Sequence, residues 1–336
     1  MVFKVGVTRD LMMADGTPCF APAAFGELEK GEAEIAWEWL PETLAEITPD
    51  IMARFDGLHV NLPRVTRASA ARGDCRVKII ARNGVGYDSV DVAALTEKGI
   101  VVTNTPVAVR RPVAVATLTL LFALAGRLFA KDKLVRTGRW NDRVEHMGLG
   151  LTSRTLGLVG AGSIGQEIAR LAKPFFGRII AADPYVGEAA IAAAGATKAP
   201  FDTVMAESDF VVVCSLLTPE TRHMIDARAF ALMKREAFYL NVGRGPIHDE
   251  AALIAALRAG RIAGAGLDVT EVEPIQPDNP LIQMDNVILT PHALCWTDEC
   301  FEDIARTALR SLADYAAGRR PVHVVDPTAW DRRAGR

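Results

Sequence analysis

The sequence predicts an α/β protein with two domains, each built on a parallel sheet, in which the larger domain is inserted into the smaller one. Three observations support this. After position 154, six short β-branched runs alternate with helical stretches, which is typical of a parallel sheet covered on both faces. The first hundred residues show a weaker form of the same alternation. The length of 336 residues accommodates two domains.

The larger domain is predicted over residues 107–296. A long helical segment at about 110–137 is expected to lead into it. Its six strands are expected in the runs "TLGLVGAG", "RIIAADP", "DFVVVCSL", "AFYLNVGRG", "GAGLDV" and "NVILTPH". Helices are expected in "SIGQEIARLAKPF", "ATKAPFDTVMAES", "IDARAFALMK" and "DEAALIAALRAG". This order predicts a doubly wound, Rossmann-type sheet.

The smaller domain is predicted to be discontinuous, over residues 1–106 plus 297–336. Its strands are expected in "FKVGVTR", "DGLHVNL", "VKIIARNG" and "IVVTNTP", and its helices in "ITPDIMARF" and "SVDVAALTEKG". A helix near 297–318 would return the chain to this domain, followed by a tail that carries proline and arginine.

Composition excludes several classes of function. Half of the residues are hydrophobic, the net charge is −3, and no block of Lys and Arg exceeds two residues, so we expect no nucleic-acid partner. The apolar run near 112–126 is too short to span a bilayer, and the N-terminus lacks a signal-peptide pattern. We therefore expect a soluble, cytoplasmic protein. The five cysteines show neither CxxC nor zinc spacing, which predicts free thiols and no metal; they are Cys19, Cys75, Cys214, Cys295 and Cys300.

A glycine-rich fingerprint predicts the cofactor site. Gly160, Gly162 and Gly165 follow the strand "LGLV" and open the helix "SIGQEIARL". Gly160 permits the tight turn, Gly162 lets the backbone approach a pyrophosphate, and Gly165 lets helix and strand pack closely. The helix N-terminus then offers unpaired N–H groups to phosphate. A glycine-rich turn without a ligand is the alternative, and the strand–turn–helix context favours the dinucleotide.

The acid after the next strand predicts the choice of cofactor. Asp183 lies about 20 residues beyond the fingerprint, where a carboxylate binds the adenosine ribose hydroxyls. A carboxylate there would repel a 2′-phosphate, and "DPYVGE" holds no Arg or Lys to receive one. The sequence therefore predicts NAD rather than NADP.

Three polar residues follow predicted strands of the larger domain and suit hydride transfer to or from a 2-hydroxy acid. In a parallel sheet the carboxyl ends of the strands face the ligand, so Arg244, Glu273 and His292 are expected to converge there. His292 would exchange a proton with the substrate oxygen, and Glu273 would favour the protonated imidazole and orient it. Arg244 would bind the substrate carboxylate. Taken singly, each could be a turn residue, a surface carboxylate or a salt-bridge partner.

With these motifs the chain resembles the D-isomer-specific 2-hydroxyacid dehydrogenases, a family that includes phosphoglycerate dehydrogenase and the glyoxylate/hydroxypyruvate reductases. The resemblance rests on "ARNGVGYDSVD", "VVTNTP", "GLVGAGSIGQEIA", "LLTPETRHMI", "NVGRGPIHDEAAL", "GAGLDVTEVEP" and "NVILTPH", in this order. It implies an NAD-binding Rossmann domain inserted into a flavodoxin-like substrate domain. It also implies a homodimer that associates through the NAD-binding domain.

The resemblance also implies roles for individual residues. Arg244, Glu273 and His292 match the family's catalytic Arg, Glu and His, and Asp268 would hold the nicotinamide carboxamide. Val85 and Gly86 match the loop whose N–H groups bind the substrate carboxylate, together with Arg244 and His292. The implied cofactor-binding residues are Gly160, Gly162, Ser163, Ile164, Gly165, Asp183, Ser215, Val242, Gly243, Arg244, Asp268 and His292.

Departures from the family pattern leave the substrate open. Cys214 and Leu216 alter the cofactor wall, and the bulky segment "ALCW" at 293–296 follows the predicted catalytic histidine.

A second hypothesis for the function is an NAD(H)-sensing, corepressor-like binding protein of the same fold. A β-hydroxyacid dehydrogenase would need a helical second domain, for which the chain after 297 is too short. Formate or phosphite oxidation is a further alternative, and formate chemistry would favour an amide at Glu273. Four other histidines show no partner in the sequence and are interpreted as structural or exposed; they are His59, His146, His223 and His323. His248 is interpreted as the residue that enters a helix, before the acids of "DEAAL".

Overall fold

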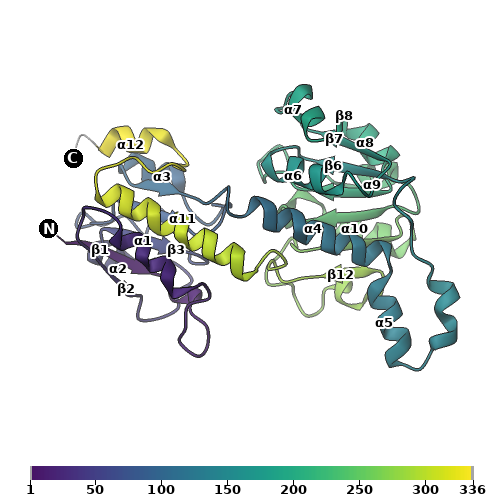
Figure 1. Cartoon of the computed structure of the whole chain (residues 1–336), viewed down its shortest axis with the longest axis horizontal. Helices are drawn as coiled ribbons and strands as arrows, with labels where there is room; N and C mark the ends of the chain where they lie inside the picture. Colours follow the sequence, from purple (N-terminus) through teal and green to yellow (C-terminus); the bar gives the residue numbers. More distant parts are fainter. Residues whose placement is uncertain (1, 334–336) are drawn as a thin grey trace. The chain divides into compact units, whose positions relative to one another are not determined.

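The computed structural model describes residues 2–333 and divides into two compact units (Figure 1). Residues up to Val109 and from Trp296 onward form the first unit, and Arg110–Cys295 form the second. The boundaries expected from the sequence, 107 and 296, lie three residues and one residue from these.

The first unit holds a five-stranded parallel sheet. Its strands are β1 (Phe3–Val7), β2 (Ile35–Trp39), β3 (Gly57–Val60), β4 (Ile79–Arg82) and β5 (Val101–Thr103), in the order β2-β1-β3-β4-β5. This is the flavodoxin-like order 2-1-3-4-5. Four strands confirm the prediction. Strand β2 was missed because it is a half-exposed edge strand whose sequence, IAWEW, carries no continuous apolar run.

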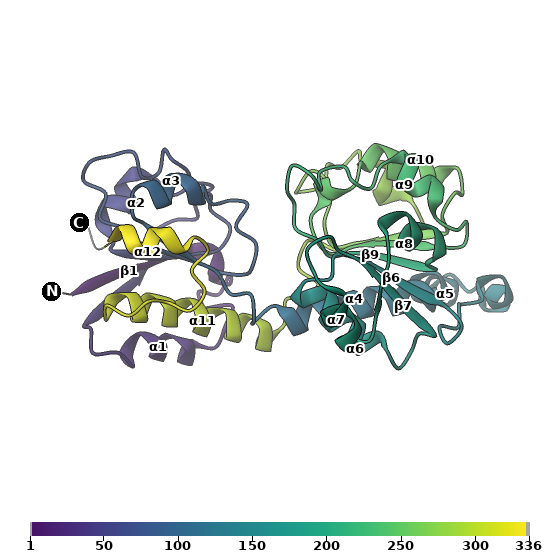
Figure 2. The ribbon, with the colours of Figure 1, turned by 90° about the horizontal axis from the view of Figure 1, so that it is seen from above.

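Helices cover both faces of this sheet (Figure 2). Helices α1 (Gly26–Glu29) and α11 (Asp298–Ala316) pack on one face, and α2 (Pro49–Arg54) and α3 (Val92–Glu97) on the other. The predicted tail is more ordered than expected, because Val324 bridges to Thr103 beside β5 and helix α12 (Pro327–Arg333) follows. The C-terminal segment therefore completes the unit that the N-terminal segment begins.

The second unit holds a seven-stranded parallel sheet in the order β12-β11-β10-β9-β6-β7-β8. Counted from β6, this is the Rossmann order 3-2-1-4-5-6 with one further strand. The six predicted strands are present, and the two-residue β8 was missed within a stretch expected to be helical. The strands are β6 (Thr155–Val159), β7 (Arg178–Ala182), β8 (Thr197–Lys198), β9 (Phe210–Val213), β10 (Phe238–Asn241), β11 (Gly264–Leu267) and β12 (Val287–Leu289).

Two apolar layers enclose this sheet (Figure 2). Helices α4 (Arg110–Ala125) and α6 (Ser163–Ala172) pack on one face. Helices α8 (Phe201–Glu207), α9 (Ala227–Leu232) and α10 (Glu250–Arg258) pack on the other, and α7 (Glu188–Ala193) follows β7. Because both faces of the central strands are buried, their sequences are continuous apolar runs rather than alternating ones.

The helical segment expected at 110–137 is broken. Helix α4 ends at Ala125 and α5 (Leu128–Arg136) begins after Arg127, whose φ of 50° lies in the left-handed region and cannot continue a right-handed helix. The short helix η3 (Trp140–His146) follows. No single helix within residues 2–333 is long and apolar enough to cross a membrane. Helices α4 and α5 reach the required length and apolarity only when taken together, and they are bent by 56° relative to each other.

Candidate active site

The three glycines of the fingerprint, Gly160, Gly162 and Gly165, have different surroundings, and each fits one requirement of a dinucleotide site. Gly160 has a φ of +102°, and a Cβ there would lie 2.8 Å from the Ser215 nitrogen. A Cβ at Gly165 would lie 2.3 Å from the Gly160 oxygen, so only glycine lets α6 pack against this turn. A Cβ at Gly162 would have no neighbour within 4 Å, which leaves its face open to a ligand.

We expect Gly165→Ala to destabilise the turn and weaken NADH binding. The added methyl group would collide with backbone, which costs about 1–3 kcal/mol and displaces the helix N-terminus. The unfolding temperature and the fluorescence-derived Kd for NADH should therefore both change. Gly162→Ala is the matched variant, and it should weaken binding at an unchanged unfolding temperature. Unchanged stability and affinity of Gly165→Ala would contradict this account.

The N-terminus of α6 fits a pyrophosphate. The N-cap residue is Gly162, which has no side chain to cap the helix, so the first helical N–H groups, those of Ser163 and Ile164, are not claimed by a cap. Nearby, the Ser215 hydroxyl oxygen is buried and has no hydrogen-bond partner in the described chain. An unpaired buried hydroxyl is unfavourable unless a ligand satisfies it.

Asp183 is fixed at the edge of the same turn. Its Oδ2 accepts a hydrogen bond from the Ala161 N–H at 2.8 Å, and its Oδ1 accepts from the N–H groups of Tyr185 and Val186 at 2.9 and 3.0 Å. A carboxylate has about four acceptor sites. These three bonds therefore leave capacity for a further donor such as a ribose hydroxyl.

His292 and Glu273 form a hydrogen-bonded pair. His292 Nδ1 lies 2.8 Å from Glu273 Oε2, and Glu273 Oε1 accepts from the Thr270 N–H at 3.2 Å. Burial raises the pKa of Glu273, but the hydrogen bond and charge of His292, the Thr270 N–H and the charge of Arg244 outweigh it. The net result is a pKa below the usual 4.5. Glu273 is therefore a carboxylate at neutral pH, and this ionised form is lost only as the pH falls through that lowered value.

The backbone at His292 is strained, and hydrogen bonds to Asp268, which follows strand β11, hold the loop that carries it. Its φ of 54° is unusual for a residue other than glycine and costs about 1–3 kcal/mol. Asp268 Oδ1 accepts from Thr290 Oγ1 at 2.7 Å and from the N–H groups of Ala293 and Leu294, each at 3.1 Å. Asp268 thus anchors the loop on both sides of His292. Its expected bond to the nicotinamide carboxamide stays a prediction.

The Arg244 loop lies directly on the segment that carries Glu273. A Cβ at Gly245 would lie 1.8 Å from the Thr270 oxygen, so this approach tolerates glycine alone. The positive charge of Arg244 also lowers the pKa of Glu273. The structure therefore brings Arg244, Glu273 and His292 together at the carboxyl ends of β10, β11 and β12. Val242 and Gly243 precede Arg244 on this loop, and a Cβ at Gly243 would lie 2.9 Å from the Ser215 oxygen.

Val85 and Gly86 lie in the first unit, on the loop after β4. Gly84 has a φ of +117° and donates its N–H to Thr105 Oγ1 at 3.1 Å, and Asn104 Nδ2 donates to the Val85 oxygen at 2.8 Å. Over residues 2–333, neither the Val85 N–H nor the Gly86 N–H donates a hydrogen bond. Both are free to bind a carboxylate, and that role stays a prediction.

Several residues of this site escaped the sequence analysis. Asn241 Oδ1 accepts a hydrogen bond from the N–H of Gly243, two residues on. Asn side chains often form such turns, so the sequence "NVG" could have indicated this one. Thr290 carried no such signal. The interpretation of His223 as a residue without a partner was wrong, since its Nε2 lies 2.7 Å from Glu271 Oε1. His59 also has a partner, Asn83 Oδ1 at 3.0 Å.

We expect Glu273→Gln to lower kcat by about tenfold or more across the pH range, because the carboxylate that pairs with His292 is lost. The amide keeps a hydrogen-bond acceptor but loses the charge that favours the imidazolium. The measurement is kcat against pH between 5 and 10, with the exposed Glu236→Gln as the control. A profile that superimposes on that of the wild type would contradict the pairing.

Comparisons with known proteins agree with this geometry. Residues 118–293 match the family described as D-isomer specific 2-hydroxyacid dehydrogenase, NAD binding domain. The chain is 38% identical to the glyoxylate reductase of Thermococcus onnurineus over 304 residues, 89% of this chain and 90% of that one. It is 35% identical to the D-3-phosphoglycerate dehydrogenase of Archaeoglobus fulgidus over 265 residues, 79% of this chain and 50% of that one.

A solved structure agrees over almost the full length. The crystal structure of a glyoxylate reductase from Paecilomyes thermophila has a TM-score of 0.82 and 26% identity, covering 96% of this chain and 98% of that one. The fold order of both sheets, the glycine-rich turn and the family match over more than half of the chain lead to one conclusion. The chain belongs to the D-isomer-specific 2-hydroxyacid dehydrogenases, enzymes that depend on a nicotinamide dinucleotide.

Proposed function

We propose that this enzyme reduces a small 2-oxoacid to the D-2-hydroxy acid with NADH, using His292, Glu273 and Arg244. The 2.8 Å contact between His292 Nδ1 and Glu273 Oε2 carries the proposal. It leaves the other ring nitrogen, Nε2, as the proton donor toward substrate. The names of the relatives, glyoxylate reductase and D-3-phosphoglycerate dehydrogenase, support this class of substrate.

The proposed cofactor contacts follow from the carboxyl edge of the second sheet. The N–H groups of Ser163 and Ile164 and the open face of Gly162 would hold the pyrophosphate, and Asp183 the adenosine ribose. Ser215, Val242, Gly243 and Asp268 would line the nicotinamide side. Bound there, the nicotinamide supplies the hydride.

The protein supplies the proton and the charge. His292 Nε2–H donates its proton to the substrate oxygen as the carbonyl becomes a hydroxyl, and Glu273 stabilises the imidazolium before that transfer. Arg244 binds the substrate carboxylate and polarises the oxo group with its planar fork. The N–H groups of Val85 and Gly86 would donate to the same carboxylate.

Following NADH absorbance against glyoxylate, hydroxypyruvate, pyruvate, 2-oxoglutarate and 3-phosphohydroxypyruvate tests the proposal. We expect saturable oxidation of NADH with at least one acid and, for acids other than glyoxylate, whose product is achiral, a D-configured product. Tight NADH binding without turnover of any acid would instead favour the corepressor-like alternative. The family match and the assembled pair of His292 and Glu273 favour the enzyme.

We propose NAD(H) as the preferred cofactor because Asp183 places a carboxylate beside the glycine-rich turn. One cation lies near the loop that follows Asp183: Lys198 Nζ donates a hydrogen bond to the Val186 oxygen at 2.7 Å. The ratio of kcat/KM for NADH over NADPH should exceed about tenfold, and Asp183→Ser should lower it. A wild-type preference for NADPH would overturn the assignment.

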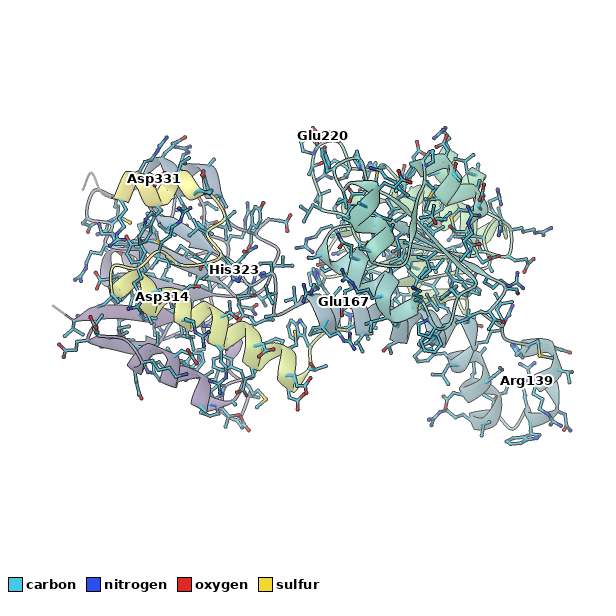
Figure 3. All side chains as sticks on the ribbon, turned by 45° about the horizontal axis from the view of Figure 1, so that its top comes forward. Arg139, Glu167, Glu220, Asp314, His323 and Asp331 are labelled. Carbon is cyan, nitrogen blue, oxygen red and sulfur yellow. The ribbon has the colours of Figure 1, made fainter. Side chains whose placement is uncertain are left out.

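We also propose a homodimer formed through the second unit. Helix α5 and η3 project from this unit (Figure 1), and Arg139 lies on the projection (Figure 3). Large apolar side chains are exposed there, which is typical of an interaction surface; they are Leu128, Phe129, Val135, Trp140, Val144 and Met147. The thiols of Cys19, Cys75 and Cys214 form no disulfide, which fits a reducing, cytoplasmic location; we propose that location on this basis.

Phe129→Asp should convert the dimer to a monomer, because a charge in an apolar interface costs several kcal/mol. Sedimentation equilibrium would then give the chain mass of 36.2 kDa instead of about twice that value. Val322→Asp, at a more exposed apolar site in the first unit, is the control and should leave the mass unchanged. A wild-type monomer would refute the proposal.

A further inference from the structure

A buried polar cluster lies behind the Arg244 loop. Tyr239 and Asn241 belong to β10, and His248 precedes α10; the side chains of all three are fully buried. Buried polar groups are unfavourable unless they are hydrogen-bonded, so the pairing of each atom shows what the cluster does.

The amide of Asn241 uses its hydrogen-bonding capacity on both sides of the loop. Its Oδ1 accepts from the Gly243 N–H at 3.0 Å, and its Nδ2 donates to the Arg244 oxygen at 2.9 Å. These two backbone groups settle which amide atom is oxygen, because an N–H only donates and a carbonyl only accepts. The second Nδ2 proton points to His248 Nδ1, 2.9 Å away.

This contact determines the state of His248. Its Nδ1 accepts from Asn241, so the ring proton lies on Nε2, which is buried without a partner within residues 2–333. Burial lowers the pKa of His248 to about 4; the charges of Glu271 and Asp249 oppose this effect, and that of His223 adds to it. The imidazole is therefore neutral, and it carries the cost of an unpaired N–H.

An apolar side chain would fill the same space without that cost. The specific contribution of the imidazole is the acceptor at Nδ1, which fixes the rotation of the Asn241 amide. We propose that His248 is a positioning residue that acts through Asn241 to hold the loop of Gly243 and Arg244 in its substrate-binding geometry. The inference rests on the proposed role of Arg244.

The loop transmits this restraint to the guanidinium. Arg244 Nη1 donates to the Gly243 oxygen at 2.8 Å, and the N–H of the same Gly243 is held by Asn241. The Arg244 oxygen is held by the other end of the Asn241 amide. Rotation of that amide would release the Gly243 N–H and the Arg244 oxygen, the two backbone groups that it holds next to the Arg244 side chain.

Three variants separate the acceptor from the packing. His248→Leu keeps the bulk and removes the acceptor, and we expect kcat/KM for the 2-oxoacid to fall about tenfold to hundredfold, chiefly through KM. His248→Asn places an amide oxygen on Cγ, where Nδ1 stood, and should recover activity to within about threefold of wild type. Tyr239→Phe removes a hydroxyl that lies 3.3 Å from Nδ1 and should change little, because Asn241 keeps its bond. His248→Val replaces the leucine variant if the latter does not fold.

A double-mutant cycle tests the route through Asn241. In an Asn241→Ala background, His248→Leu should cost less than about threefold, because the bond it breaks is already absent. NADH affinity, measured by fluorescence, should stay within about threefold of wild type in each single variant of His248, since the glycine-rich turn is untouched.

The outcomes distinguish the two proposals. If the wild type reduces no 2-oxoacid, the proposed function fails. If the wild type is active and His248→Leu retains its kcat/KM, or costs the same in both backgrounds, the positioning role is overturned. Equal losses in the Leu and Asn variants would also overturn it, because they would show that packing alone matters.

Discussion

Replacing His292 with alanine should reduce kcat by about 10²- to 10⁴-fold, the range that a positioned general acid contributes. The imidazole is the group that Glu273 orients, with 2.8 Å between His292 Nδ1 and Glu273 Oε2. Without it, the substrate oxygen must take its proton from water. NADH binding should persist, because the glycine-rich turn does not depend on this side chain. Stopped-flow turnover and a fluorescence titration measure the two effects separately.

Two further measurements sharpen this prediction. Added imidazole should restore part of the lost activity of His292→Ala by occupying the vacated space. His323→Ala, in the first unit (Figure 3), should turn over at the wild-type rate. Turnover of His292→Ala near the wild-type rate would show that the proton comes from another group, and the proposed mechanism would be lost.

Replacing Arg244 should have the second large effect. Arg244→Gln removes both the charge and the planar fork, and losing such a charge-paired contact costs about 2–5 kcal/mol. That corresponds to roughly thirtyfold to several-thousandfold in kcat/KM for the 2-oxoacid. Arg244→Lys keeps the charge without the fork and should fall between wild type and the Gln variant.

Steady-state kinetics at saturating NADH would resolve the order of these variants. Arg258→Gln, at the exposed end of α10, serves as the control for a lost arginine charge in the same unit. Oxamate, a carboxylate analogue of 2-oxoacids, should bind the Arg244→Gln–NADH complex much more weakly than the wild-type complex. Equal oxamate affinity would remove Arg244 from the substrate site.

Much of the fold was accessible from sequence because its strands are short, apolar and buried. The runs from "TLGLVGAG" to "NVILTPH" each became a strand of the second sheet. Strands without that signature escaped: β2 is a half-exposed edge strand and β8 has two residues. The break between α4 and α5 also escaped, because Arg127 in a left-handed conformation has no sequence signature.

The candidate site divides in the same way. Sequence alone predicted five of its residues, because each follows a predicted strand and has a chemistry suited to one step; they are Gly160, Asp183, Arg244, Glu273 and His292. Their supporting contacts were not found. The bonds from Thr290, Ala293 and Leu294 to Asp268 join segments more than 20 residues apart.

The sequence by itself therefore determined the α/β class and the dinucleotide turn, and it indicated the side chains that we propose as catalytic, because hydrophobic periodicity and glycine spacing are local properties of the chain. Only the tertiary structure decided that Asp268 holds the His292 loop and that His248, through Asn241, holds the Arg244 loop. The physical reason is that a hydrogen bond across 2.9 Å depends on how β10, β11 and their loops pack. No local pattern encodes that distance.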